Sequence, residues 1–596
     1  MTTASPTTAS PTTASPATPT QNPSAAPLER LTRLLGELTG PGQPFSPEAL
    51  AELDRTEAFP AEACQALDAF GLRRYYVPAE HGGALESFDV VMGLLRAVSR
   101  IDLTVAVSHG KTYLGAAATW IAGEPEAARR LGERIAEGTP VSCALTERHH
   151  GSDLMGGELT ARPAPGGGRL LSGEKWPINL ATRAGLVTVL ARTDDNGGPR
   201  GFSLFLVDKS RLAPERFTHL PKVPTYGIRG ADISGIAFHD APLPEEALIG
   251  RLGEGIEIIV KALHLSRTGC IAMSLGAGDH ALALAAEFVA QDGGGLARDP
   301  YVRRELGEAA AGLLLADATG LVAARSPHAL AGETSVISAV AKAYVPTEVD
   351  TLIARLLHLL GPYGLLRPDD PHTGFAKVER DHRIIGIFDG SSLVNRSALI
   401  EQFPRIARGY AKGRWDAEGL AEATNPHAPL RPMRPREFGL VSSGGCSVMA
   451  GLPAAVGELR DLAVRGHAST ALTTVAGRLL DVSDRLHQDL AAIRFSPRAV
   501  PGHAFRLAER FESCFAAASA LHLWLRAAAR ARSSLPETAL LACLVKALTD
   551  LEEPVDDADR TVFDDLADAV LARPSALFHS LLDHVEPTSS QEGAVS

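Results

Sequence analysis

The feature that most constrains this chain is a change of hydrophobic period near Val141 and a second change near Gly255. Before Val141 the apolar residues recur three and four positions apart, as in LERLTRLLGELT, which is typical of amphipathic helices. Between the two positions the apolar runs are short, alternating or β-branched, and Gly, Pro, Asn and Asp separate them. Long Ala- and Leu-rich helical segments follow. The pattern predicts an α+β chain in which a strand domain of roughly 110 residues lies between helical domains.

The same pattern divides the chain into successive parts. Three copies of TTASP and a Pro-rich stretch open it, and such small polar residues cannot bury enough surface to offset the entropy of ordering. A Pro-, Gly- and Ser-rich stretch precedes a last helical block. We expect a disordered leader over 1–27, a helical N-terminal domain over 28–140, a β-barrel-like domain over 141–250, a C-terminal four-helix-bundle domain over 251–405, a linker over 406–452 and an appended all-α domain over 453–596.

Composition excludes several classes of protein. With 596 residues, 45% of them hydrophobic, the chain is neither wholly disordered nor a small disulfide scaffold. Its formal charge of −12 repels phosphate backbones, so we expect no nucleic-acid partner. The six cysteines lie far apart without a C-x-x-C pair, which favours a reducing compartment and argues against a thiolate zinc site.

The presence or absence of membrane-spanning and secretory segments bears on where the protein is located. The charge-free stretch 439–457 is interrupted by Gly, Ser and Pro, so no segment is predicted to span a membrane. The N-terminus lacks the basic and then apolar order of a secretory signal. We therefore expect a cytoplasmic protein without a membrane partner. His149 and His150 are adjacent, but no third ligand accompanies them at useful spacing, so no metal site is predicted.

Three segments carry a resemblance when they are taken together and in order. They are ALTERHHGSD (144–153), GIRGADISGIAFHDAPLPEEALIG (227–250) and RDHRIIGIFDGSSLVNR (380–396). These resemble the L-T-E-P-x-x-G-S-D, G-x-R-G and R-D-x-K-I-x-x-I-x-E-G-T motifs of the acyl-CoA dehydrogenase family of flavoproteins. The resemblance covers roughly residues 28–405. The appended block resembles the C-terminal extension of very-long-chain members only in size and placement.

The resemblance implies FAD as cofactor and the removal of two hydrogens from an acyl thioester, on coenzyme A or on a carrier protein, to give a 2-enoyl product. One carboxylate takes the α-proton, and Asp389 stands where the family has its glutamate base before G-T. Aspartate is one methylene shorter, and proton transfer needs heavy atoms about 2.6–3.2 Å apart. The family's second base position is Ser266 here, and serine cannot serve. Asp389 could instead cap a turn, because Asp-Gly is a common turn pair.

Further residues acquire expected roles from the resemblance. Arg267 matches an arginine near the active site that helps to keep the base ionised, although a surface arginine on a helix is an equal alternative. Thr146 matches the threonine at the flavin edge and Ser152 the serine near the pyrophosphate. Ser391 replaces the threonine of E-G-T and keeps its hydroxyl. Ordinary loop hydroxyls are the alternative for Thr146 and Ser152.

Other positions depart from the family pattern. In GEKWPIN (173–179), Pro177 takes the place of the aromatic residue that packs on the flavin, Trp176 comes one place early, and Asn179 replaces the threonine near flavin N5. The R-x-x-F-G that binds a neighbouring subunit's flavin is not visible after AAEFVA. In HLLGPYG, His358 stands where the family has a glutamine that touches the partner's cofactor, but it could equally pack in its helix.

Three functions stay open at this stage. The first is the acyl-thioester dehydrogenase, with electron-transfer flavoprotein or a similar acceptor as partner and a homodimer or homotetramer as the assembly. The second is a nitroalkane-oxidase-like flavoprotein, since those enzymes share this fold and use an aspartate base at the matching position. The third is a catalytically degenerate subunit of a heteromeric dehydrogenase. Flavin content and the substrate that reduces the flavin would separate them.

Overall fold

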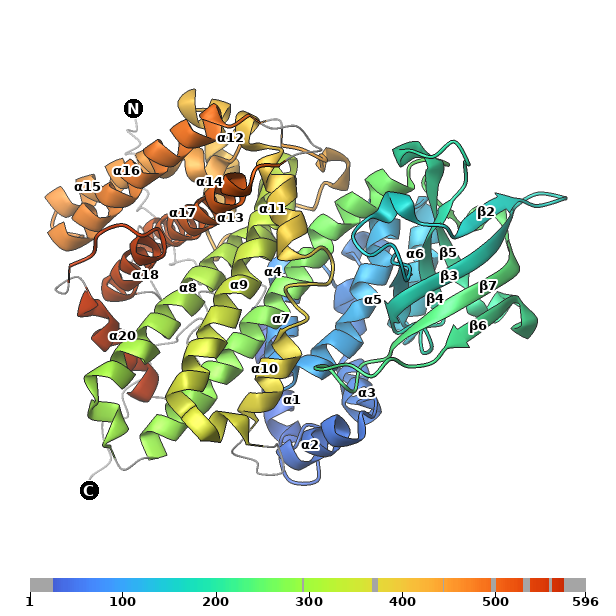
Figure 1. The fold of residues 1–596 in the computed structure, drawn as a ribbon, viewed down its shortest axis with the longest axis horizontal. Helices are drawn as coiled ribbons and strands as arrows, with labels where there is room; N and C mark the ends of the chain where they lie inside the picture. The colour runs from blue at the N-terminus through green and yellow to red at the C-terminus, as the bar shows by residue number, and fades with distance from the viewer. Residues whose placement is uncertain are drawn as a thin grey trace, which may run out of the picture.

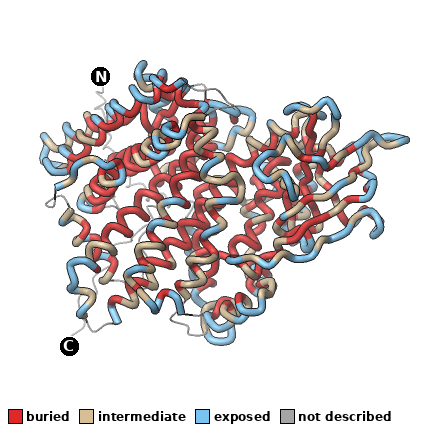
Figure 2. The backbone as a smooth tube through the Cα atoms, viewed as in Figure 1, coloured by how far each residue is buried: buried red, intermediate tan, exposed pale blue. Residues whose placement is uncertain are grey.

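The computed structural model describes residues 25–291, 294–366, 374–442, 444–494, 500–528, 536–556 and 560–572. In this part of the chain a helical bundle stands at the centre, an eight-stranded sheet lies on one side of it, and the appended helices lie on the other (Figure 1). Buried residues form stripes along the central helices and along the inner strands (Figure 2).

The N-terminal domain consists of helices, as predicted. α1 begins at Ala25, inside the predicted leader; the rest of that leader, 1–24, lies outside the described residues. Pro27 is tolerated there because the first four N–H groups of a helix have no intrahelical partner. The helices are α1 (Ala25–Leu38), α2 (Pro47–Thr56), α3 (Ala61–Phe70), α4 (Phe88–Ser99), α5 (Leu103–Ala122) and α6 (Pro125–Ala136).

The central domain is a single open sheet, so the expected barrel-like closure is wrong. Its order is β6-β7-β3-β2-β4-β5-β8, and β1 pairs in parallel with β4. β6 and β8 end the path and leave the sheet open. The strands are β1 (Val141–Ala144), β2 (Thr160–Pro163), β3 (Arg169–Asn179), β4 (Leu186–Arg192), β5 (Phe202–Asp208), β6 (Phe217–Leu220), β7 (Ile233–Leu243) and β8 (Leu248–Ile249).

One irregularity of this sheet affects the site. The β3–β7 register shifts between Lys175 and Ile178, where Pro177 has no N–H to give to the ladder. Such a shift changes the direction in which the following side chains point.

The C-terminal bundle is built from three long helices and a broken fourth. α7 (Gly255–Gln291), α8 (Pro300–Ala329) and α9 (Thr334–Leu360) pack side by side. α10 (Phe375–His382) and α11 (Ser392–Ile400) complete the bundle end to end, with a turn between them (Figure 1). Contrary to the sequence-based expectation, α7 and α8 are long and apolar enough to span a membrane. Because their apolar windows are 83% and 100% buried inside the protein, they serve here as core helices.

The appended helices pack on the bundle face opposite the sheet. α17 contacts α8, α9 and α11, and α20 lies on α8. Arg396 of α11 pairs with Glu509 at 2.7 Å and Glu512 at 3.0 Å on α17. The helices are α15 (Leu452–Val464), α16 (Thr470–Ala492), α17 (Gly502–Ala528), α18 (Glu537–Asp550) and α20 (Val562–Ala572).

The predicted linker over 406–452 is wrong as a description of this segment. α12 (Phe403–Ala411), α13 (Ala417–Ala423) and α14 (Ser447–Ala450) lie in or across it, and Phe438 and Met449 are buried. The segment packs because its scattered apolar residues reach the core between the short helices, despite its Pro and Gly content.

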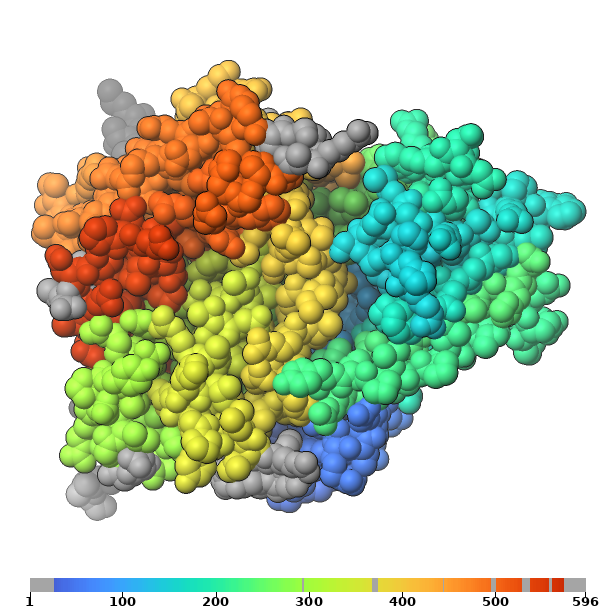
Figure 3. Space-filling model, in the orientation of Figure 1, coloured from blue at the N-terminus to red at the C-terminus, as the bar shows by residue number. Residues whose placement is uncertain are grey.

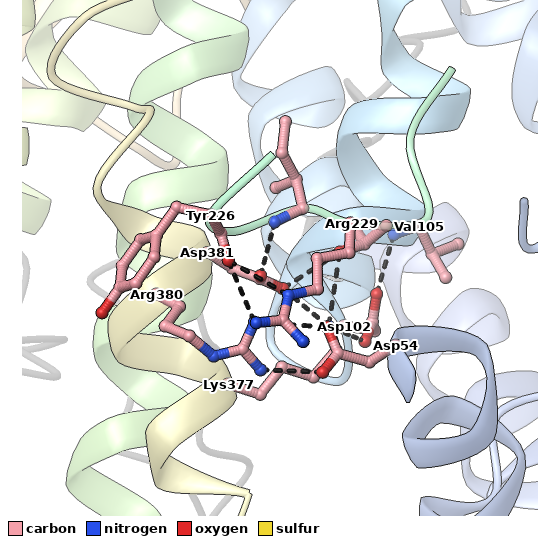
Figure 4. A network of polar contacts seen from close by, with 10 residues as sticks. Asp54, Asp102, Val105, Tyr226, Arg229, Lys377, Arg380 and Asp381 are labelled. Carbon is pink, nitrogen blue, oxygen red and sulfur yellow. Dashed lines mark hydrogen bonds and ion pairs between the residues drawn. The ribbon is translucent and has the colours of Figure 1, made fainter. Parts of the chain in front are cut away.

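A buried charge network joins the N-terminal helical domain, the sheet domain and the C-terminal bundle (Figure 4). Asp381 of α10 accepts from the Ile228 N–H at 2.6 Å and from Lys377 at 2.6 Å. Lys377 also donates to Asp102, the N-cap of α5, at 2.6 Å. Arg380 pairs with Asp54 at the end of α2 at 2.7 Å. α10 is thereby fixed both to the N-terminal helices and to the loop that precedes β7.

Close backbone contact reinforces this junction. A Cβ at Gly227 would lie 2.1 Å from the Arg380 carbonyl oxygen, so only glycine permits the loop to approach α10. Burial lowers the pKa of Lys377, but Asp102 and Asp381 outweigh that effect and raise it above its usual value. Lys377 therefore stays cationic between the two carboxylates.

Replacing Lys377 by methionine should destabilise the protein by about 3–5 kcal/mol, because Asp102 and Asp381 would be left as buried carboxylates without their shared cation. Chemical denaturation of purified protein measures the loss. Arg129→Met is the matched control: its carboxylate partners are exposed, so it should cost less than about 1 kcal/mol. Equal effects of the two substitutions would contradict the assignment.

Candidate active site

A cavity of about 920 Å³ lies between the sheet domain and the helical bundle. Figure 3 shows the surface hollowed between these two parts, beside the segment that carries α10 and α11. Its lining is mainly apolar and comes from α5, β1 and the loop after it, the end of β3, the 225–228 loop, α7 and the α10–α11 turn. Asp389, Arg267, Thr146, Ser152 and Asn179, five of the seven predicted site residues, are among the lining residues.

Asp389 occupies the turn where the fourth bundle helix is broken. Its backbone φ is 55°, in the left-handed region that non-glycine residues rarely adopt, and Gly390 follows with φ 92°. Such conformations persist only where surrounding groups enforce them, and they cluster at functional sites. The turn directs a carboxylate into the cavity from an otherwise helical column.

Two buried side chains hold this turn. Lys342 of α9 donates to the carbonyl oxygens of Ile385 at 2.7 Å and Gly390 at 3.2 Å, one on each side of Asp389. The Asn395 side-chain amide donates to Gly390 at 2.8 Å and to Ser391 at 2.9 Å. The turn is thus fixed from a neighbouring helix and from α11.

Arg267 and Cys270 of α7 surround the Asp389 carboxylate. The Cys270 thiol donates to Asp389 Oδ2 at 3.4 Å, and burial, with Asp389 adding to the effect, raises the pKa of that thiol well above its usual value. Arg267 donates to Ser338 at 3.2 Å and to His264 Nδ1 at 3.4 Å. Burial lowers the pKa of Arg267 to about 10, so at neutral pH it remains a cation close to Asp389. The helix-surface alternative for Arg267 is wrong, because the side chain is buried.

The sheet side of the cavity presents Thr146, Pro177 and Asn179. The Thr146 hydroxyl donates to the Pro177 carbonyl at 3.0 Å. Asn179 donates from Nδ2 to the Val107 carbonyl at 3.2 Å, which leaves its buried Oδ1 without a hydrogen-bond partner. Trp176 points away, as expected from strand alternation, and lies under the Arg148 guanidinium at 4.5 Å.

Ser152 lies in the exposed loop at the rim of the cavity, whereas Ser391 and His358 are not among the residues that line it. The Ser391 hydroxyl caps α11 and accepts from the Val394 N–H at 3.2 Å, since this serine immediately precedes the helix. His358 is exposed on α9, so the alternative that it packs within the helix is not the arrangement seen. Its expected contact with a partner subunit's cofactor stays a prediction.

Three residues at this site are not predicted from the sequence motifs: Lys342, Cys270 and Lys111. Lys111 lines the cavity from α5. A signal for it exists in the sequence, because it is the one charged residue in the 20-residue helix LTVAVSHGKTYLGAAATWIA. Lys342 is likewise a single cation in an apolar stretch of α9, whereas nothing in the local pattern marks Cys270.

Three models of the acyl-CoA dehydrogenase family match the chain in order. The N-terminal domain matches residues 45–139, the middle domain 142–241 and the C-terminal domain 253–403. A curated relative, the probable acyl-CoA dehydrogenase FadE25 of Mycobacterium tuberculosis, is 28% identical over 364 residues, which are 59% of this chain and 89% of the relative. The chain belongs to the acyl-CoA dehydrogenase family, oxidoreductases that act on CH–CH groups.

Solved structures show the same fold. An acyl-CoA dehydrogenase from Bacillus anthracis, complexed with FAD, has a TM-score of 0.66 at 19% identity and covers 92% of this chain and 95% of its own. Its coverage extends into the appended helices. The prolyl acyl carrier protein oxidase AnaB has a TM-score of 0.57 at 19% identity and covers 64% of this chain and 98% of its own.

FAD is the cofactor of this family, and the cavity fits a flavin. Its lining is largely apolar, and three of the lining residues carry a buried oxygen without a hydrogen-bond partner among the described residues: Tyr113 Oη, Asn179 Oδ1 and Thr225 Oγ1. Buried polar atoms of this kind are normally satisfied, and a bound group would supply partners there. Thr146, Asn179 and Thr225 would hold the ring, and the 151–155 loop at the rim would face the phosphates.

Lys342→Met should loosen the Asp389 turn, because it removes both hydrogen bonds that join the turn to α9. We expect faster amide hydrogen exchange in the segment 385–391. We also expect slower substrate-driven flavin reduction, since a displacement of about 1 Å costs about 10²-fold. Hydrogen exchange followed by mass spectrometry and stopped-flow absorbance measure the two effects.

Lys546→Met provides the matched control for this prediction. Lys546 is also a buried lysine, but it lies on α18 and pairs with Asp550 of the same helix and with Glu348 of α9, away from the Asp389 turn. Its loss should lower stability and leave exchange at 385–391 unchanged. A uniform increase in exchange in both variants would show that Lys342 acts only on global stability.

Proposed function

We propose that this protein is an FAD-dependent acyl-thioester dehydrogenase that forms a 2-enoyl thioester, with Asp389 as the base. The observation that carries the proposal is a carboxylate on a left-handed turn, directed into the cavity that fits a flavin. In this reaction Asp389 would take the α-proton, and the electron pair of that C–H bond would become the new double bond. FAD, held by Thr146, Asn179 and Thr225, would supply the two-electron acceptor that takes the β-hydrogen together with its bonding pair.

The surrounding residues have complementary roles in this proposal. Arg267 places a buried cation close to the Asp389 carboxylate. The Cys270 thiol restricts the carboxylate to the orientation in which Oδ2 accepts its hydrogen bond. The apolar walls exclude water, which strengthens each electrostatic contact inside. Thr146 and Asn179 position the ring from the sheet side.

The substrate and acceptor follow from the family. We propose a coenzyme A thioester as substrate, with a carrier-protein thioester as the alternative suggested by the AnaB structure. We propose electron-transfer flavoprotein or a related acceptor to reoxidise the cofactor. A cytoplasmic location also stays a proposal; it is supported by six free and buried cysteines.

Asp389→Asn should retain FAD but lose substrate-driven bleaching of the flavin by about 10²–10⁴-fold, because the amide cannot take the α-proton. Asp389→Glu, which restores the acid of the family motif, should keep activity on simple acyl-CoA. Stopped-flow absorbance with butyryl-CoA, after flavin content has been matched, measures both. Unchanged bleaching in Asp389→Asn would overturn the assignment of the base.

The same assay separates the other functions. Wild-type protein purified without bound flavin, which also fails to take up added FAD, would support the degenerate subunit. Peroxide release with a nitroalkane and no reduction by acyl-CoA would support the nitroalkane oxidase.

We also propose a homodimer or homotetramer in which a neighbouring copy completes the cofactor site. The support is an exposed apolar group next to His358, with Tyr363 59% and Leu365 69% exposed. Light scattering should give at least twice the 62.7 kDa chain mass. Leu365→Glu should lower both the assembled fraction and the FAD content, and a monomer with full FAD content would contradict the proposal.

A further inference from the structure

Lys111 is the one lining cation of the cavity that lacks a partner among the described residues. The other three are engaged: Arg380 with Asp54, Arg383 with Glu379, and Arg267 with Ser338 and His264. Lys111 has neither a hydrogen bond nor an ion pair within this part of the chain. An ammonium in such a place has lost part of its hydration without a protein group in return, which is unfavourable unless a ligand supplies the charge.

Lys111 lies on the face of α5 that lines the same cavity as Asp389. Val107, Gly110, Lys111 and Leu114 recur at three- and four-residue spacing and form one face of α5 toward the cavity. Gly110 and Leu114 leave the lysine in apolar surroundings.

The charge of Lys111 acts on the pKa values of two buried thiols that line the cavity, Cys143 and Cys270. Burial raises the pKa of Cys143 on β1 to about 12, and the Lys111 ammonium partly offsets that effect. Lys111 acts in the same direction on Cys270, the thiol that donates to Asp389. The charge of Lys111 thus acts on one thiol from the sheet side and one from the helical side of the cavity that it lines.

We propose that Lys111 recognises a carboxylate carried by the acyl group of the substrate, so that the preferred substrates are ω-carboxyacyl thioesters. This inference rests on the proposed function, since it assigns the acyl group to this cavity. A carboxylate would give the ammonium the charge-assisted hydrogen bond that the protein does not supply. A saturated acyl chain would leave the lysine unpaired and desolvated.

The same charge disfavours the opposite class of substrate. An acyl group with a protonated amine, such as a prolyl group, would bring two cations together in an apolar cavity, and like charges in such surroundings repel strongly. In this proposal Lys111 therefore disfavours a prolyl group, the acyl group named for the AnaB oxidase, although the two proteins share a fold.

The test compares glutaryl-CoA with pentanoyl-CoA, which have equal chain length and differ in carrying a terminal carboxylate or a methyl group. Binding is measured by calorimetry with FAD-loaded Asp389→Asn protein, in which turnover does not interfere. We expect glutaryl-CoA to bind more tightly, and Lys111→Met in this background to weaken it about 10- to 100-fold while pentanoyl-CoA binds equally well or better. kcat/KM for the two thioesters in otherwise wild-type protein should change in the same ratio.

The controls separate the possible causes. Lys412→Met removes an exposed lysine just after α12 that is not among the residues lining the cavity, and it should change neither affinity. An equal loss for both thioesters in Lys111→Met, or no loss for either, would overturn the inference. So would a shift in the midpoint potential of the ligand-free flavin with an unchanged glutaryl-to-pentanoyl ratio, because Lys111 would then serve the cofactor.

Failure of the proposed function would look different. Wild-type protein whose flavin is reduced by neither thioester would refute the dehydrogenase itself. Reduction by pentanoyl-CoA that is as efficient as reduction by glutaryl-CoA, and equally so in Lys111→Met, would refute only the role of the lysine.

Discussion

The arrangement of this protein depends on one break in a helical column, the turn between α10 and α11. A continuous helix there would satisfy its own backbone hydrogen bonds and would not leave a left-handed turn at the cavity. The break instead places Asp389 in a left-handed conformation, which is unfavourable for a residue with a Cβ. Lys342, Asn395 and the cap at Ser391 offset that cost by satisfying the carbonyl and N–H groups that the break exposes. Around it, a charge network fixes α10 to the two preceding domains.

Much of the fold could be predicted from the sequence, because the spacing of apolar residues and the positions of Gly, Pro, Asn and Asp are local properties of the chain. The switch near Val141 coincides with the start of β1, and the return to helix coincides with Gly255, the first residue of α7. Whether the sheet closes depends instead on which strands meet at its edges, and no local pattern encodes that. The sequence of segment 406–452 predicts a linker, not packed structure, because its helices are short and its buried residues, such as Phe438, lie far apart.

At the site, too, some features follow from the local sequence and others depend on packing between distant segments. Motif positions led to Asp389, Arg267, Thr146, Ser152 and Asn179, and the structure brings all five to one cavity. Ser391 illustrates the limit: a hydroxyl at a motif position was predicted to face the cofactor, but its place just before a helix makes it a cap. Lys342 and Cys270 come from other helices and act across space, so their roles depend on packing that the motifs do not contain.

The ion pairs of Arg396 with Glu509 and Glu512 of α17 attach the appended helices to the helix that follows the Asp389 turn. Arg396 lies at the middle of α11, the short helix that begins directly after the Asp389 turn, so this helix is bound to the appended block as well as to the turn. A change at Glu509 or Glu512 of α17 would remove a partner of the nine-residue helix that follows the Asp389 turn, so the extension takes part in fixing the position of that turn.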